Sequence, residues 1–235
     1  MQKNRWQTVA GHAEIRYGQY IVPNFVSSSV ALQVTEHELV IISPGEALLA
    51  DWPEAWRGPQ MKISIIMPNG FHYLGVKAWQ AAFPQAVLYA SAKAIDRLNG
   101  KGISGIRALE KEQPALPAGY KILLPPGHRA GDMWLCKTCP QQGALWITCD
   151  SFLNYARYSR QPIARFLQKR LDAAPGLKIS QVVKWFILDD RHTFKNWVLA
   201  RLDEDKPRIL IPSHGEILCA ADLSEQLRCL VDARL

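Results

Sequence analysis

The sequence predicts an α/β protein in which helices cover a core of two β-sheets. Short apolar runs fill the first half, a strand–helix–strand unit follows, and a later series of strands is interrupted by a helical segment. The 235 residues suit a single domain, 1–235, that is long enough to bury a sizeable core. With 48% apolar and 21% charged residues, the composition is that of an ordinary globular protein.

The first half is expected to alternate short strands with a few helices. Gly, Pro and Asn separate the apolar runs, so strands are predicted at Ala13–Tyr17, Ile21–Phe25, Ser29–Thr35, Glu38–Ile42, Met61–Met67 and Gln85–Ala90. Helices are predicted at Pro44–Trp56, Tyr73–Phe83 and Ser91–Leu98. Ser91 can cap the last of these, and Asn99-Gly100 can end it.

A helical insertion is expected to interrupt the strands of the second half at about 154–205. Strands are predicted at Lys121–Leu124, Asp132–Cys136, Ala144–Cys149 and Arg208–Ile211, with a terminal helix at Ala221–Leu230. Three apolar helical faces are predicted in the insertion: Ile163, Phe166, Leu167 and Leu171; Ile179, Val182, Val183 and Phe186; and Phe194, Trp197, Val198 and Leu202. Trp185 also fits a helical apolar face, and most of the tryptophans are expected in the core.

One segment within this insertion, Tyr155–Arg201, holds the whole net charge of +7. Between Tyr155 and Arg201 there are ten Lys or Arg and three Asp, while the rest of the chain is balanced. Because these cations are dispersed, the favoured interpretation is the solvent side of amphipathic helices. The alternative is a surface that attracts an anionic small-molecule substrate or, less favoured, nucleic acid.

The sequence favours a cytoplasmic location. The N-terminus has no apolar stretch typical of a secretory signal, and five cysteines are an odd number for a disulfide framework. Cys136 and Cys139 form a C-x-x-C without a second pair, so ordinary free thiols are expected. The apolar runs are too short for a membrane span, and no membrane partner is expected. The oligomeric state stays open.

Four polar residues follow strand-like runs. His72, His128, Asp150 and His214 come after the runs MKISIIMP, YKILLPP, ALWITC and RILIP. Strand ends fix a position while their loops leave the side chain accessible. Three imidazoles and one carboxylate would suit one zinc or iron ion.

Four segments resemble the metallo-β-lactamase superfamily in the expected order. PNGFHYLGVKAWQAAFPQAVLYAS is similar to its first metal-binding segment, and LPPGHRAGDMWL to the segment of its fourth histidine. GALWITCDSFLN resembles its bridging-aspartate segment and ILIPSHGEIL its final-histidine segment. The resemblance implies a four-layer αββα sandwich with a metal site at one edge of the two sheets.

The first segment departs from the His-x-His-x-Asp-His pattern of that superfamily and resembles a divergent branch. His72 matches the last histidine, but Met67, Asn69 and Phe71 hold the earlier positions. The resemblance therefore implies a metal-dependent hydrolase-like protein with a reduced, single-ion site. Its metal ligands would be His72, His128, Asp150 and His214, with Asp150 and His128 also in catalytic roles, His128 as a fourth ligand or a proton shuttle.

Each of these residues also has a structural interpretation. His72 could cap the Tyr73 helix, His128 and His214 could be turn residues, and Asp150 could bond to backbone N–H groups of a turn. The competing function is a non-catalytic binding or scaffold protein that retains the sandwich, which the loss of ligands at 67, 69 and 71 favours.

Overall fold

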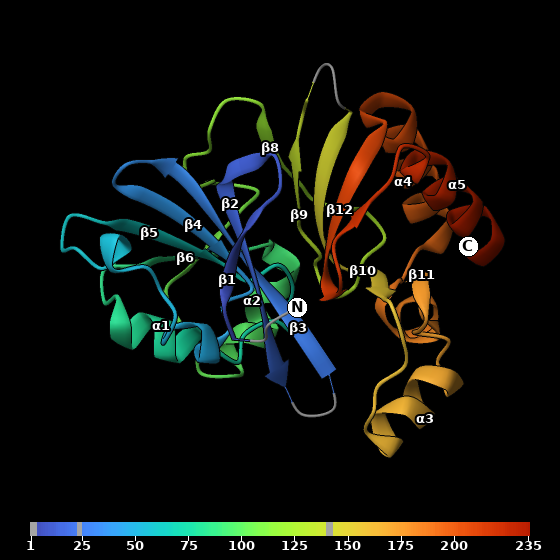
Figure 1. Ribbon diagram of the computed structural model, residues 1–235, viewed down its shortest axis with the longest axis horizontal. Helices are drawn as coiled ribbons and strands as arrows, with labels where there is room; N and C mark the ends of the chain where they lie inside the picture. Colours follow the sequence, from blue (N-terminus) through green and yellow to red (C-terminus); the bar gives the residue numbers. More distant parts are fainter. Residues whose placement is uncertain (1–3, 23–24, 140–142) are drawn as a thin grey trace. The chain divides into compact units, whose positions relative to one another are not determined.

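The computed structural model describes residues 4–22, 25–139 and 143–235. The chain divides into two compact units, Met1–Ala118 and Gly119–Leu235. The first is blue to green in Figure 1 and the second is green to red. None of the described helices is long and apolar enough to span a bilayer.

In the described part of the first unit, seven strands form one sheet in chain order. They are β1 (Trp6–Val9), β2 (His12–Val22), β3 (Phe25–Thr35), β4 (Glu38–Ile42), β5 (Lys62–Ile66), β6 (Val87–Ala90) and β7 (Ile106–Ala108). Pairing is antiparallel from β1 to β4 and parallel from β4 to β7. The expected strand Ile21–Phe25 is shared between β2 and β3, and its Pro23 and Asn24 lie outside the described residues.

The helices of this unit are short. They are α1 (Val76–Ala82), α2 (Ala92–Asn99) and two 3-10 turns, η1 (Glu46–Leu48) and η2 (Glu54–Trp56). The helix expected over Pro44–Trp56 is therefore wrong, because Pro53 directly precedes η2 and has no N–H group to continue a helical ladder.

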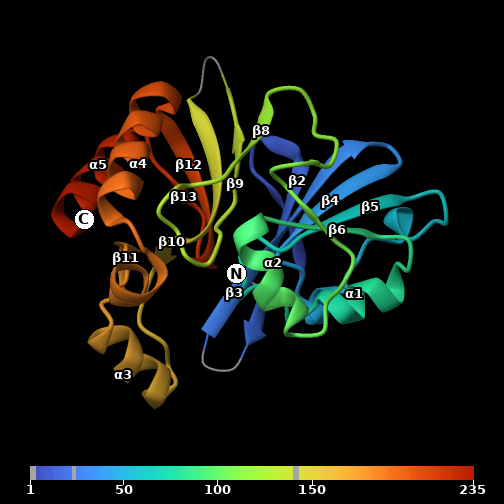
Figure 2. The same ribbon diagram turned by 180° about the vertical axis from the view of Figure 1, so that it is seen from behind.

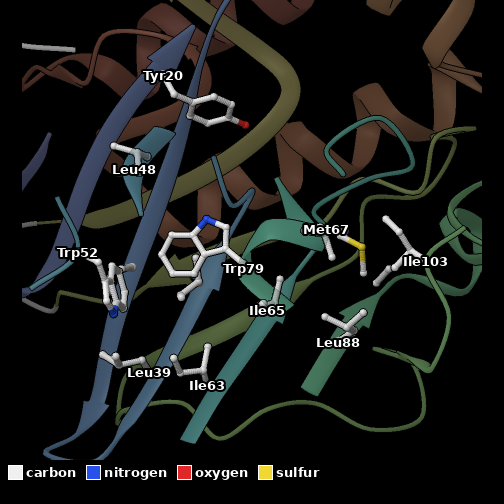
Figure 3. Packing of buried hydrophobic residues seen from close by; sticks show 14 of the residues in the cluster. Tyr20, Leu39, Leu48, Trp52, Ile63, Ile65, Met67, Trp79, Leu88 and Ile103 are labelled. Atoms are coloured by element: carbon white, nitrogen blue, oxygen red, sulfur yellow. The ribbon is translucent and has the colours of Figure 1, made fainter. Parts of the chain in front are cut away.

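Tryptophan side chains pack among aliphatic ones in the core of the first unit (Figure 3). Trp52 and Trp79 pack edge to face with ring centroids 4.8 Å apart, and Trp6 packs against both. Their polar edges are satisfied, since Trp6 donates to the carbonyl of Leu48 and Trp79 to the carbonyl of Gly45. The expected assignment of Trp79 to the core is confirmed.

The second unit holds a second sheet, six-stranded over its described residues. Its strands are β8 (Tyr120–Leu123), β9 (Trp134–Lys137), β10 (Ala144–Tyr155), β11 (Gly176–Lys178), β12 (Pro207–Gly215) and β13 (Leu218–Cys219). The order is β13-β12-β10-β9-β8, with β11 also on β10. Only β10 and β12, among these pairs, run parallel. Residues 140–142, between β9 and β10, are outside the described part.

The helices of the second unit are α3 (Pro162–Arg170), the π-helical turn η3 (Val183–Ile187), α4 (Arg191–Asp205) and α5 (Leu223–Arg234). In Figures 1 and 2, α4 and α5 lie side by side, whereas α3 lies apart from them below β11. Trp134, Trp146 and Trp197 form the aromatic core beneath α4.

Asp205 ties the end of α4 to the sheet. Its carboxylate accepts hydrogen bonds from Trp146 Nε1 at 3.0 Å and from Lys121 Nζ at 3.2 Å, and it pairs with Arg201. Burial alone would raise the pKa of Asp205, but the hydrogen bonds and charges of Arg201 and Lys121 outweigh it and hold this pKa below its ordinary value.

The first predicted apolar face does not lie as expected, whereas the second is confirmed at Ile179 and Val183, which are buried in the core, and wrong at Phe186. Ile163 and Phe166 point outward from α3, whose buried side chains are Ala164 and Gln168. Trp185 and Phe186 are likewise exposed on η3. The spacing of apolar residues correctly predicted an amphipathic helix at α3. In the structure, however, this helix packs against the rest of the unit through the face that carries Ala164 and Gln168. The third face was predicted correctly, since Phe194, Val198 and Leu202 are buried on α4.

Candidate metal site

A large bulge interrupts the pairing of β10 with β12. Thr148 lies opposite Pro212, and the next pair is Leu153 with His214, so β10 advances five residues while β12 advances two. Bulges bend a strand and redirect side chains, and they are common beside active sites. Asp150 lies within this bulge of β10. The expectation that Asp150 follows the end of its strand is therefore wrong, because the bulge lets β10 continue to Tyr155.

Asp150 and His214 meet at this bulge. Asp150 Oδ1 and His214 Nε2 are 3.2 Å apart, and the side chains are 15% and 19% exposed. The next residue fixes the position of His214: Gly215 has φ +104°, and a Cβ there would stand 1.9 Å from the carbonyl oxygen of Asn154. Only glycine allows β12 to pass this close to β10.

The spacing of this pair suits a shared cation. Two ligand atoms bound to one tetrahedral ion at about 2.1 Å lie about 3.4 Å from each other. A carboxylate oxygen and an imidazole nitrogen are ligands that zinc and iron both accept. The same contact is also a good ion pair if His214 is protonated, so the pair fits both a metal site and a salt bridge.

His128 lies in a fully buried polar network of the second unit. Its Nε2 is 3.0 Å from Asp132 Oδ2, and both side chains are completely buried. The same carboxylate oxygen accepts a hydrogen bond of 2.7 Å from Ser151 Oγ, and Ser151 in turn accepts one from Trp134 Nε1. Ser151 lies in the β10 bulge, so the network reaches the residue next to Asp150.

Asp132 is the functional candidate that sequence reasoning missed. One carboxylate oxygen of Asp132, the Cys149 thiol and a carboxylate oxygen of Asp150 lie within 4.8 Å of one another. Burial raises the pKa of the Cys149 thiol, and the charges of Asp150 and Asp132 raise it further, so Cys149 acts as a small buried side chain. The signal for Asp132 was present, because a carboxylate directly before the apolar run Met133–Cys136 needs a partner.

In the first unit, His72 is held by a serine. Its Nδ1 is 2.7 Å from Ser43 Oγ, and His72 is only 8% exposed. The interpretation of His72 as a helix cap is wrong, since α1 begins at Val76 with Gly75 before it. The hydrogen bond orients the imidazole ring as partners of metal-binding histidines do.

The other three positions of the first segment serve local structure. Met67 is fully buried in the apolar core (Figure 3). Asn69 Oδ1 accepts the N–H of Phe71 at 2.8 Å, which closes an Asx turn. The Phe71 ring is 42% exposed beneath the guanidinium of Arg97, whose carbon lies 4.1 Å from the ring centroid. Packing, turn formation and a cation–π contact therefore replace ligand chemistry here.

Solved structures identify the fold. A metallo-β-lactamase from Pontibacter korlensis matches with a TM-score of 0.62 at 13% identity over 97% of this chain and 99% of that one. A metallo-β-lactamase from Hirschia baltica matches with a TM-score of 0.60 at 13% identity over 97% and 98%. The chain has the metallo-β-lactamase fold. The predicted resemblance and fold class are confirmed at this level.

The metallo-β-lactamase fold also occurs in flavo di-iron proteins. A variant of the flavo di-iron protein from Thermotoga maritima matches with a TM-score of 0.61 at 14% identity, over 99% of this chain and 62% of that one. No protein-family model and no curated protein sequence matches the chain. At such low identity the likeness establishes the scaffold, and the chemistry has to be argued from the residues.

Proposed function

We propose that the protein is a metal-dependent hydrolase-like protein that holds one zinc or iron ion through Asp150, His214 and His72. The observation that carries the proposal is the 3.2 Å approach of Asp150 Oδ1 to His214 Nε2 at the bulge of β10. His72 joins them by the order of the superfamily segments, and its bond to Ser43 supports a ligand role. A single ion is proposed because Met67, Asn69 and Phe71 leave a second position without its usual donors.

The residues around the ion have distinct tasks in this proposal. A bound zinc or iron ion supplies Lewis acidity and lowers the pKa of water at the site. His128, a predicted ligand or proton shuttle, is given the proton role, because Asp132 lies 3.0 Å from its Nε2 and can stabilise a protonated ring. Ser151 fixes the Asp132 carboxylate. Phe71 replaces an acidic residue of the superfamily pattern, so we expect slow turnover.

The proposed substrate is a small anionic ester or phosphoester in the cytoplasm. The support for an anion is the excess of ten Lys or Arg over three Asp between Tyr155 and Arg201, in the same unit as Asp150 and His214. Positive charge near a site raises the local concentration of anions and their rate of association.

Metal content tests the site directly. Protein freed of metal, reloaded separately with zinc, iron and manganese and then dialysed, is expected to retain close to one equivalent of one metal by elemental analysis. Asp150→Ala and His214→Ala should each lose most of it, while His37→Ala, at an exposed position of the first unit, should retain it. Retention below a tenth of an equivalent of each metal would sink the proposal.

The alternative function is a non-catalytic binding protein on the same scaffold. The observation that favours it is the structural use of Met67, Asn69 and Phe71. A screen with phosphodiester, thioester and lactone substrates distinguishes the two. Hydrolysis that disappears in Asp150→Ala supports the enzyme, whereas no hydrolysis by metal-loaded protein, or an activity unchanged in the variant, supports the binding protein.

A further inference from the structure

Four large apolar side chains of the second unit face solvent on neighbouring segments. Ile163 and Phe166 of α3 are 68% and 66% exposed, and Trp185 and Phe186 of η3 are 56% and 67% exposed. We call these four residues the outward apolar surface. Their sequence pattern is that of buried helical faces, so their exposure leaves apolar area in water that a partner could cover.

On α3 the apolar residues share their face with cations. Ile163 and Phe166 are three positions apart and therefore adjacent on the helix. Lys169 and Arg170 follow Phe166 at the third and fourth positions, and both are exposed. Their flexible stems can extend along an apolar surface while the charges reach beyond it. The exposed arc of α3 is therefore apolar and basic at once.

The same combination occurs on η3. The guanidinium carbon of Arg191 lies 4.4 Å from the centroid of the Trp185 ring, and Lys184 Nζ lies 5.4 Å from it. The backbone N–H of Gln181 donates to the carbonyl of Leu171 at 2.8 Å, which joins the start of this turn to the end of α3. Trp185 Nε1 donates to Gln181 Oε1, so the exposed ring is held in place.

The charge around this surface is strongly positive. Residues 157–191 contain eight Lys or Arg and three Asp. Two of the acids have structural roles: Asp172 pairs with Lys178 and Arg234, and Asp190 caps α4 through the N–H of Thr193. The surface therefore complements an anionic partner.

We propose that the outward apolar surface binds an anionic lipid bilayer, with its four side chains in the headgroup region and the surrounding Lys and Arg on lipid phosphates. Exposed Trp, Phe and Ile beside Lys and Arg are the composition of interfacial membrane-binding segments. A surface for binding single-stranded nucleic acid is less favoured, because bases stack on aromatic rings or guanidinium planes and the aliphatic Ile163 offers neither. The positive charge argues against a second copy, because two such faces repel each other.

Vesicle flotation of the full chain tests this surface. We expect binding to vesicles of phosphatidylcholine mixed with phosphatidylglycerol and much weaker binding to phosphatidylcholine alone. Trp185→Ser with Phe186→Ser should lower the partition coefficient about tenfold, and Lys169→Ala with Arg170→Ala roughly fivefold for each lost cation. Ile21→Ser, at a residue 57% exposed on β2, is the matched control and should bind like the wild type.

Three outcomes would overturn the proposal. They are no binding to anionic vesicles at low salt, equal loss of binding in Ile21→Ser, and a surface that binds single-stranded oligonucleotides or self-associates instead of binding lipid. Because the substituted side chains are exposed, unchanged circular dichroism and melting temperature should accompany the loss of lipid binding. The measurement needs no bound metal, so its result is independent of the proposed hydrolase site.

Discussion

Ser43 Oγ lies 2.7 Å from His72 Nδ1, and this contact links the end of β4 to the loop after β5. Ser43 adopts a left-handed backbone with φ +54° and is almost fully buried. Its N–H donates to the carbonyl of Ile66, and its own carbonyl accepts a hydrogen bond from Ser29 Oγ at 2.5 Å. The serine is therefore fixed by both neighbouring strands, and in the proposed metal site Nε2 of His72 would be the ligand atom.

Ser43→Ala should weaken metal binding without removing a ligand. Loss of a partner that orients a metal-binding histidine lowers affinity about 10- to 100-fold. The matched variant Ser27→Ala removes a different buried hydroxyl, one that lies on β3. We expect a weakened metal titration for Ser43→Ala only, together with a changed ¹⁵N shift pattern of the His72 ring in metal-free protein. Equal metal affinity in both variants would argue that His72 is not a ligand.

Gly215→Ala should be strongly destabilising. A Cβ at Gly215 would stand 1.9 Å from the carbonyl oxygen of Asn154, so β12 would have to move away from β10. Gly176→Ala is the matched control, since it also has positive φ but no atom within 4 Å of the new Cβ. The control should cost about 1–2 kcal/mol for its left-handed backbone alone, and Gly215→Ala clearly more. If Gly215→Ala and Gly176→Ala had similar free energies of unfolding in urea, this would contradict the close approach of β12 to β10 at Gly215.

His128 and Asp132 should show strong energetic coupling. Removing one partner of a buried polar contact leaves the other group buried with fewer interactions, which costs about 1–3 kcal/mol. We therefore expect Asp132→Asn and His128→Gln each to be destabilising, and the double variant to be much less destabilised than the sum of the two. A double-mutant cycle from chemical denaturation measures this coupling. Additive losses would mean that the 3.0 Å contact contributes nothing.

Asp205 should make the second unit sensitive to acid. Its pKa is held below the ordinary value of 3.8, so its stabilisation is complete above that pH and is lost as the pH falls through the lowered pKa. Asp205→Asn should lower stability at neutral pH by about 1–3 kcal/mol, through weakened bonds to Trp146, Lys121 and Arg201. The difference in stability between Asp205→Asn and the wild type should shrink as the pH falls toward 3. Melting curves of both proteins across this range provide the test, and a deficit that does not depend on pH would contradict the role of its charge.

The sequence allowed the main elements to be predicted because their apolar periods are clear. The strand expected at Glu38–Ile42 coincides with β4, since a polar turn and Ser-Pro-Gly bound it. The short strands β1, β7, β11 and β13 were missed. A run such as Ile106–Ala108 becomes a strand only because β6 offers an unpaired edge, and three residues carry no period of their own.

The candidate site was predictable only in part. The order of the superfamily-like segments in the sequence led to His72, Asp150 and His214. The register shift between β10 and β12 that brings Asp150 beside His214 could not be read from these segments. Ser43 is 29 residues from His72 in sequence, and its role depends on the pairing of β4 with β5. The orientation of α3 was missed because periodicity defines an apolar face without saying what covers it.

The tryptophans give each half of the chain an optical reporter of its own. Trp6, Trp52, Trp56 and Trp79 belong to the first unit, and Trp134, Trp146, Trp185 and Trp197 to the second. Replacing all four indoles of one half by phenylalanine would leave emission from the other half alone. Fluorescence could then reveal whether the two halves melt in one cooperative transition or in sequence, and which of them gives way first.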